Sequence, residues 1–99
     1  MVNGSMPIAV KKINETLFQV TVSERTTTTH TVTVAAEYWQ KLTDGKVPPE
    51  KLIEKSFEFL LEREPNTSIL RTFDLHVIQR YFPEYENTIR MLLKGPSAG

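Results

Sequence analysis

The pattern of apolar and polar residues near the start of the chain has a period of two. Phe18, Val20 and Val22 alternate with polar residues in segment 16–23, and the alternation recurs in segment 30–34. This period is typical of a strand with one buried and one wetted face. The residues between the two segments are too few for a parallel crossover, so we expect an antiparallel hairpin.

A further extended segment precedes this hairpin. Residues 7–13 could add an edge strand, because Pro7 is tolerated at the start of such a strand and Lys11 and Lys12 would blunt its free edge.

Beyond Val34 the period becomes helical. Gly45, Pro65 and other glycines and prolines divide the rest of the chain, and Asp74 is a plausible N-cap. We expect helices over residues 35–44, 49–64, 75–82 and 84–93, with a loop at 66–68. The predicted class is α+β, an N-terminal antiparallel β-hairpin, possibly of three strands, packed against three to four C-terminal helices.

The domain organisation follows from the two ends of the chain. Residues 1–5 precede a second methionine, Met6, and are interpreted as an expression scar or a disordered segment. Residues 6–94 form the predicted single α+β domain, and residues 95–99 the predicted disordered tail.

The second helix carries a broad apolar arc and an acidic stripe. The arc spans roughly 200°, wider than the ~100° that a simple surface helix needs. It predicts either a central core helix or a surface shared with a second subunit; its residues are Leu52, Ile53, Phe57, Phe59, Leu60 and Leu61. The stripe is formed by Glu50, Glu54, Glu58 and Glu62. Lys51 and Lys55 are spaced to pair with Glu54 and Glu58, so we expect a solvated face, or else a docking stripe for a basic partner.

Composition narrows the function classes. The 99 residues include 12 basic and 12 acidic side chains, so any basic surface for nucleic acid would have to be local. The chain contains no cysteine, which excludes disulfides and thiolate chemistry and is compatible with a reducing compartment. No apolar run approaches ~18 residues, so we expect a cytoplasmic protein that does not bind membranes.

The chain shows no catalytic, cofactor or metal motif. His30 and His76 are expected in surface or capping roles. Arg71, Arg80 and Arg90 could converge on an acidic or phosphate group, but we expect them to pair with acidic residues of the helical half, Glu62, Glu64, Glu84 and Glu86. We predict that the protein is not an enzyme and has no cofactor; a small enzyme with a carboxylate or arginine site is the third hypothesis.

The first hypothesis is a non-catalytic protein-interaction domain that associates with itself or with another protein. Aromatic residues dominate binding hot spots, so Tyr38 and Trp39 are the candidate contact patch. The wetted face of the hairpin, Gln19, Thr21, Thr31 and Thr33, is the second candidate surface.

A strand over 30–34, a short helix ending at Gly45 and a longer apolar helix follow one another in residues 29–63. This order resembles the ribbon–helix–helix DNA-binding family. The resemblance implies a dimer whose second helix completes the core and whose Thr29, Thr31 and Thr33 face the bases. A DNA-binding regulator or antitoxin-like protein is therefore the alternative function.

The segment Ser56–Pro65, followed by Phe73-Asp74-Leu75 and by Tyr81–Tyr85, resembles an uncharacterised group of small prokaryotic proteins. That resemblance implies a domain of this size standing alone, and it implies nothing about activity.

Overall fold

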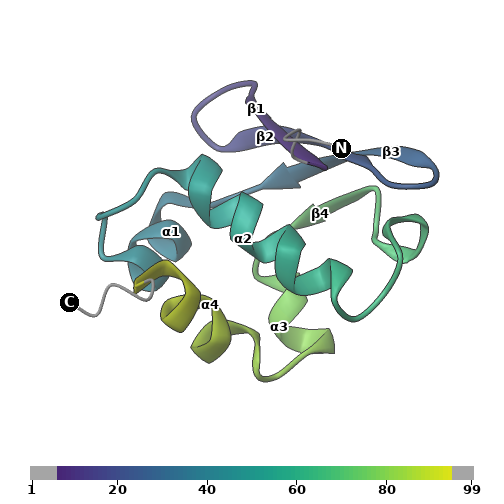
Figure 1. The fold of residues 1–99 in the computed structure, drawn as a ribbon. Helices are drawn as coiled ribbons and strands as arrows, with labels where there is room; N and C mark the ends of the chain where they lie inside the picture. The colour runs from purple at the N-terminus through teal and green to yellow at the C-terminus, as the bar shows by residue number, and fades with distance from the viewer. Residues whose placement is uncertain (1–6, 95–99) are drawn as a thin grey trace.

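The computed structural model describes residues 7–94 (Figure 1). Predictions for segments 1–5 and 95–99 lie outside the described residues. In residues 7–94 three N-terminal strands are followed by four α-helices, and one further short strand lies between the second and third of them, so the predicted α+β class is confirmed.

The sheet has four strands in the spatial order β1-β2-β3-β4. The strands are β1 (Ile8–Lys12), β2 (Leu17–Ser23), β3 (Thr27–Thr33) and β4 (Thr72–Asp74). The helices are α1 (Ala36–Thr43), α2 (Pro49–Leu61), α3 (Val77–Tyr81) and α4 (Tyr85–Lys94), with a short 3₁₀ helix η1 (Asn66–Ser68).

The predicted hairpin and the predicted edge strand are both present. β2 pairs antiparallel with β1 on one side and with β3 on the other. Phe18 lies opposite Val32 in this register, and both side chains are fully buried. The alternation read from the sequence therefore separates a core-facing from an open face of the sheet.

Strand β4 was not predicted. Phe73 lies beside Val32 in a parallel pairing and is buried, and the Leu75 amide donates to the Thr33 carbonyl at 2.9 Å. These contacts hold the backbone in an extended conformation through Asp74, so the prediction that Asp74 is a helix N-cap is wrong. Helix α3 instead begins at Val77, and its N-cap residue His76 makes no side-chain capping bond.

Helix α2 lies between the sheet and α4 (Figure 1). Five of the six residues of its predicted arc are buried and Leu61 is half-buried, which confirms the core interpretation. The arc is occupied within one chain, so it does not offer the dimer surface that the alternative interpretation required. The regular helix ends at Leu61 and not at Glu64, because the last turn tightens ahead of Pro65 and the Arg63 amide donates to Leu60.

The outer face of α2 carries the predicted ion pairs. Lys51 lies 3.7 Å from Glu54 and Lys55 lies 3.3 Å from Glu58. At their level of exposure such pairs contribute little to stability, about 0.3–0.5 kcal/mol each.

Helix α1 ends as the sequence predicts, in a left-handed turn. Asp44 and Gly45 have φ values of 57° and 73°. In residues 7–94, no helix has the length and apolar character needed to cross a bilayer.

Candidate functional site

An apolar cleft opens where the end of α2, the η1–β4 connection and α3 meet. Its volume is about 190 Å³. Leu60 and Phe73 contribute to its lining from α2 and β4, and both are buried. Leu70 and Tyr81 also line it but expose 47% and 65% of their surface. The cleft therefore joins the core to an apolar rim that is open to solvent.

The loop wall of the cleft is fixed to the sheet by a buried amide. Pro65 ends the helical conformation, and the chain turns through η1. Asn66, at 3% exposure, donates from Nδ2 to the Thr26 carbonyl at 2.7 Å and to Thr28 Oγ1 at 3.0 Å. These bonds hold the loop so that Ile69 packs inward while Leu70 faces out.

The predicted surface or capping role of His30 is wrong. Its ring is fully buried, with Nε2 2.8 Å from Thr28 Oγ1 and Nδ1 2.8 Å from the carbonyl oxygen of Leu70. Burial is the main reason that the pKa of His30 is lowered, and Arg71 lowers it further against the opposing effect of the Leu70 carbonyl. A neutral imidazole thus positions the backbone at the cleft rim.

The third wall is the short helix α3. Ile78 is buried, whereas Tyr81, at the last position of the helix, is exposed to solvent. Phe82 then packs edge-on against Phe59, with ring centroids 5.8 Å apart. Arg63 stacks on the same Phe59 ring at 3.6 Å and donates from Nε to Glu84 at 3.1 Å, which anchors the end of α2 to the turn before α4.

Glu64 supplies the only charged side chain in the lining that the described residues give this cleft. Its carboxylate forms no ion pair or side-chain hydrogen bond with any residue of 7–94. Partial burial raises the pKa of Glu64. The raised pKa reflects a carboxylate that has lost some water without gaining a compensating partner.

The lining of the cleft is mostly apolar. Ser68 supplies a hydroxyl, yet within residues 7–94 it is hydrogen-bonded to no imidazole or carboxylate that could act as its base. The same part of the chain brings no three His, Asp or Glu side chains together as metal ligands.

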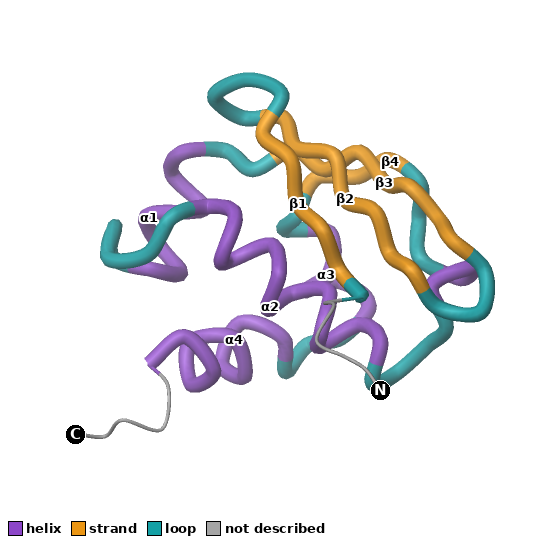
Figure 2. Tube along the Cα trace, turned by 45° about the horizontal axis from the view of Figure 1, so that its top comes forward, coloured by secondary structure: helices purple, strands orange, loops and turns teal. Residues whose placement is uncertain are grey.

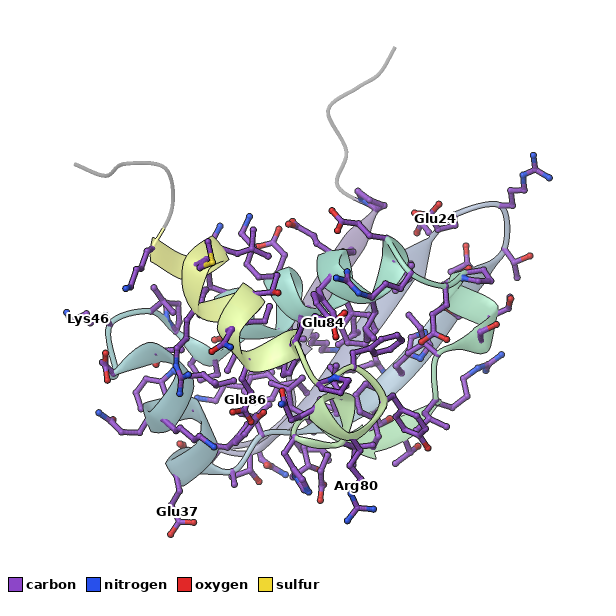
Figure 3. The ribbon with its side chains drawn as sticks, turned by 90° about the horizontal axis from the view of Figure 1, so that it is seen from below. Glu24, Glu37, Lys46, Arg80, Glu84 and Glu86 are labelled. Atoms are coloured by element: carbon purple, nitrogen blue, oxygen red, sulfur yellow. The ribbon has the colours of Figure 1, made fainter. Side chains whose placement is uncertain are left out.

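The predicted aromatic patch uses its polar atoms internally. Tyr38 and Trp39 are both half-buried on α1. The Tyr38 hydroxyl donates to Glu86 Oε2 at 2.8 Å, and Trp39 Nε1 donates to the Val47 carbonyl at 2.7 Å. Lys41 pairs with the other Glu86 oxygen at 3.3 Å, and Glu86 is seen between α1 and α4 in Figure 3. These residues lock α1 in place.

The predicted strand surface is brought together by the sheet register. Gln19 lies opposite Thr31 and Thr21 opposite Thr29, on the open face, with Thr33 further along β3. Tyr38 and Trp39 lie on α1, so the two predicted surfaces belong to different elements. Both edges of β3 are paired within the chain, to β2 and β4, so an intermolecular ribbon would require β3 to exchange a neighbour. DNA binding through Thr29, Thr31 and Thr33 stays a prediction.

The three arginines come from separate parts of the helical half of the chain. Arg71, Arg80 and Arg90 line none of the cleft and form no ion pair within residues 7–94, so their predicted pairing with nearby glutamates is wrong. Figure 3 shows Arg80 pointing away from the body of the protein. The arginine that does pair with glutamates of the helical half is Arg63, which forms ion pairs with Glu62 and Glu84.

No protein family model matches the chain, and no curated protein or solved structure shows detectable similarity to it. Function is therefore inferred from the geometry of the chain itself.

Proposed function

We propose that the protein is a non-catalytic interaction domain that binds an extended segment of a partner protein. A large apolar side chain of that segment fills the cleft beside Phe73, and a neighbouring lysine or arginine pairs with Glu64. The cysteine-free composition suits action in the cytoplasm.

The observation that carries this proposal is the exposed apolar rim. Leu70 and Tyr81 border the cavity and are both exposed. Exposed apolar patches are a feature of protein contact sites, whose binding energy is concentrated where an anchor side chain fills a well-packed pocket.

The size of the cleft favours one side chain over a whole substrate. Its volume of about 190 Å³ lies below the roughly 300–1,000 Å³ of small-molecule sites. An apolar side chain presented by a protein segment suits this space, and the remaining affinity would come from contacts along the rim.

Glu64 supports a basic neighbour for that side chain. A carboxylate that is partly desolvated and unpartnered gains most from an incoming cation, because the ion pair offsets the solvation already lost. Pairing would also return the pKa of Glu64 toward its ordinary value.

Selection of binders from a random peptide library displayed on phage tests the proposal. We expect enriched peptides to combine a large apolar residue with a nearby lysine or arginine. Their affinity for the Glu64→Gln variant should fall about threefold to tenfold, the range of a partly exposed charged contact. Enriched peptides without a shared apolar position, or binding indifferent to Glu64→Gln, would contradict the corresponding part of the proposal.

A further inference from the structure

We propose that the protein also forms a two-fold symmetric dimer through the free edge of β1, with Lys12 of each copy reaching the Glu50 and Glu54 carboxylates of the other. This inference is independent of the cleft, which lies at the opposite end of α2, beside Leu60.

As far as residues 7–94 are concerned, the outer edge of β1 has backbone groups without a strand partner. In the described part of the chain, β1 is the outermost strand of the sheet, and Figure 2 shows it at the border with α2 alongside. The Pro7 carbonyl accepts from the Ser23 amide at 2.7 Å, and the Ile13 amide donates to the Leu17 carbonyl at 2.8 Å. In an antiparallel pair, alternate residues bond to the neighbouring strand. Because residues 7 and 13 bond to β2, the N–H and C=O groups of residues 8, 10 and 12 point away from it.

A groove runs beside this edge, on the helical side of the sheet. Ile8 and Val10 form one wall, and the α2 side forms the other with Pro48, Glu50, Lys51 and Glu54, so two carboxylates and one ammonium group line the groove. A strand added to the edge of β1 would place alternate side chains against this groove.

The strand is complementary to itself in one register. An antiparallel pairing centred on Val10 places Lys12 opposite Ile8 and Lys11 opposite Ala9 of the other copy. All five residues of β1 are then paired, about six backbone hydrogen bonds form, and no lysine faces a lysine. A register centred on Lys11 would instead bring like charges together.

Charge complementarity identifies the second copy as the occupant. Lys12 shares the core-facing side of β1 with Ile8 and Val10, so in the dimer it extends toward the groove of the other copy. Glu50 forms no ion pair within residues 7–94, whereas Glu54 is paired with Lys51 at 3.7 Å. Among residues 7–94 of the same copy, Lys12 pairs only with Glu15, at 4.0 Å, and the Glu15 side chain is 94% exposed.

Both symmetry-related ends of the interface carry this contact, so Lys12 of each copy becomes part of an ion pair. Lys11 lies on the open face of the sheet, away from the carboxylates. It is therefore a matched control, with the same charge on the same strand.

Sedimentation velocity on the full chain from about 5 to 500 µM tests the dimer, because an interface of this small size is expected to be weak. We expect a reversible dimer whose dissociation constant rises at least about tenfold in Lys12→Glu and changes less than about threefold in Lys11→Glu. Adding Glu50→Lys and Glu54→Lys to Lys12→Glu should restore association. A monomer across the whole range, or equal weakening by both lysine variants, would overturn the proposal.

Amide hydrogen exchange read by NMR locates the interface. Protection of the Ile8, Val10 and Lys12 amides should increase with protein concentration, while the Ala9 and Lys11 amides are already protected by β2 at every concentration. A dimer without this alternating change would place the contact elsewhere and also overturn the proposal. Neither measurement involves the cleft. Failure of the dimer proposal can therefore be distinguished from failure of the peptide selection.

Discussion

The Nδ1 atom of His30 lies 2.8 Å from the carbonyl oxygen of Leu70, which ties the centre of the sheet to the rim of the cleft. A carbonyl only accepts, so Nδ1 carries the proton and Nε2 accepts from the Thr28 hydroxyl. Thr28 Oγ1 in turn accepts from the Asn66 amide. Both ring nitrogens of His30 and the Thr28 hydroxyl are thus hydrogen-bonded while the imidazole is neutral.

Acidification is therefore expected to destabilise the fold through His30. Because its folded pKa is lowered below the usual 6.5, the unfolded chain binds more protons in the window below about pH 6.5. The contribution to stability is complete above that pH and is lost as pH falls toward the folded pKa. The slope cannot exceed about 1.36 kcal/mol per pH unit for one proton. Urea unfolding at several pH values between 7.5 and 5 measures it.

Replacement of His30 by glutamine should remove this slope. Glu64 has a raised pKa and contributes in the opposite direction on acidification, so the difference between the wild type and His30→Gln isolates the histidine. The matched control is His76→Gln at an exposed position, which should keep the slope of the wild type. If His30→Gln loses stability on acidification as steeply as the wild type, protonation of the buried His30 ring is not the cause of that loss.

Replacement of Asn66 by alanine should loosen the loop wall of the cleft. The change leaves Thr26 and Thr28 without the amide donor in a buried site, and we expect a loss of about 1–3 kcal/mol in the free energy of unfolding. Faster amide exchange in residues 66–70 should accompany the loss. A variant as stable as the wild type would mean that water replaces the amide without cost.

The hydroxyl pair in the core behaves as one unit. Ser56 Oγ donates to the Leu52 carbonyl at 2.8 Å, so the Tyr85 hydroxyl, 2.6 Å away, is the donor to Ser56. Tyr85→Phe should cost about 1 kcal/mol, and a double-mutant cycle with Ser56→Ala should show a coupling of at least 0.5 kcal/mol. Additive costs would show that the hydroxyls do not interact in solution.

Phe57 is a core residue of α2 whose ring lies near rings of β3 and β4. Its ring is fully buried and its centroid lies 5.4 Å from that of His30 and 6.1 Å from that of Phe73. Phe57→Ala should cost about 3–5 kcal/mol by calorimetry or urea unfolding. A cost below ~1 kcal/mol would contradict the central placement of this helix.

The sequence allowed the regular part of the fold to be predicted because its signals are local. Alternation around Phe18, the stop at Gly45 and the apolar arc of α2 each reflect the preferences of neighbouring residues. Strand β4 was not predicted because three residues are too few to show a period of two. Its conformation depends on pairing with β3, some forty positions earlier in the sequence. The same long-range pairing moved the start of α3 beyond Asp74.

The candidate site was harder to predict than the fold. The cleft forms from three elements that are distant in sequence, and only adjacent apolar residues in a loop, Ile69 and Leu70, hinted that one of them must face outward. Tyr38 and Trp39 attracted notice as aromatic residues, yet their polar atoms are satisfied inside the fold. The period of two puts His30 on the same face as Val32, but its burial depends on a hydrogen bond to the Leu70 carbonyl, forty residues later, which the local pattern does not reveal.

The central claim is that the apolar rim of the cleft binds a partner segment, and isothermal titration of a selected peptide against matched surface variants tests it most directly. Leu70 and Ile13 are 47% and 49% exposed, and only Leu70 lines the cleft. We expect Leu70→Asp to weaken binding at least about tenfold, as for a contact worth more than ~1.4 kcal/mol, and Ile13→Asp to leave it within about twofold. Equal affinities for the wild type and Leu70→Asp, with both proteins folded, would contradict the claim.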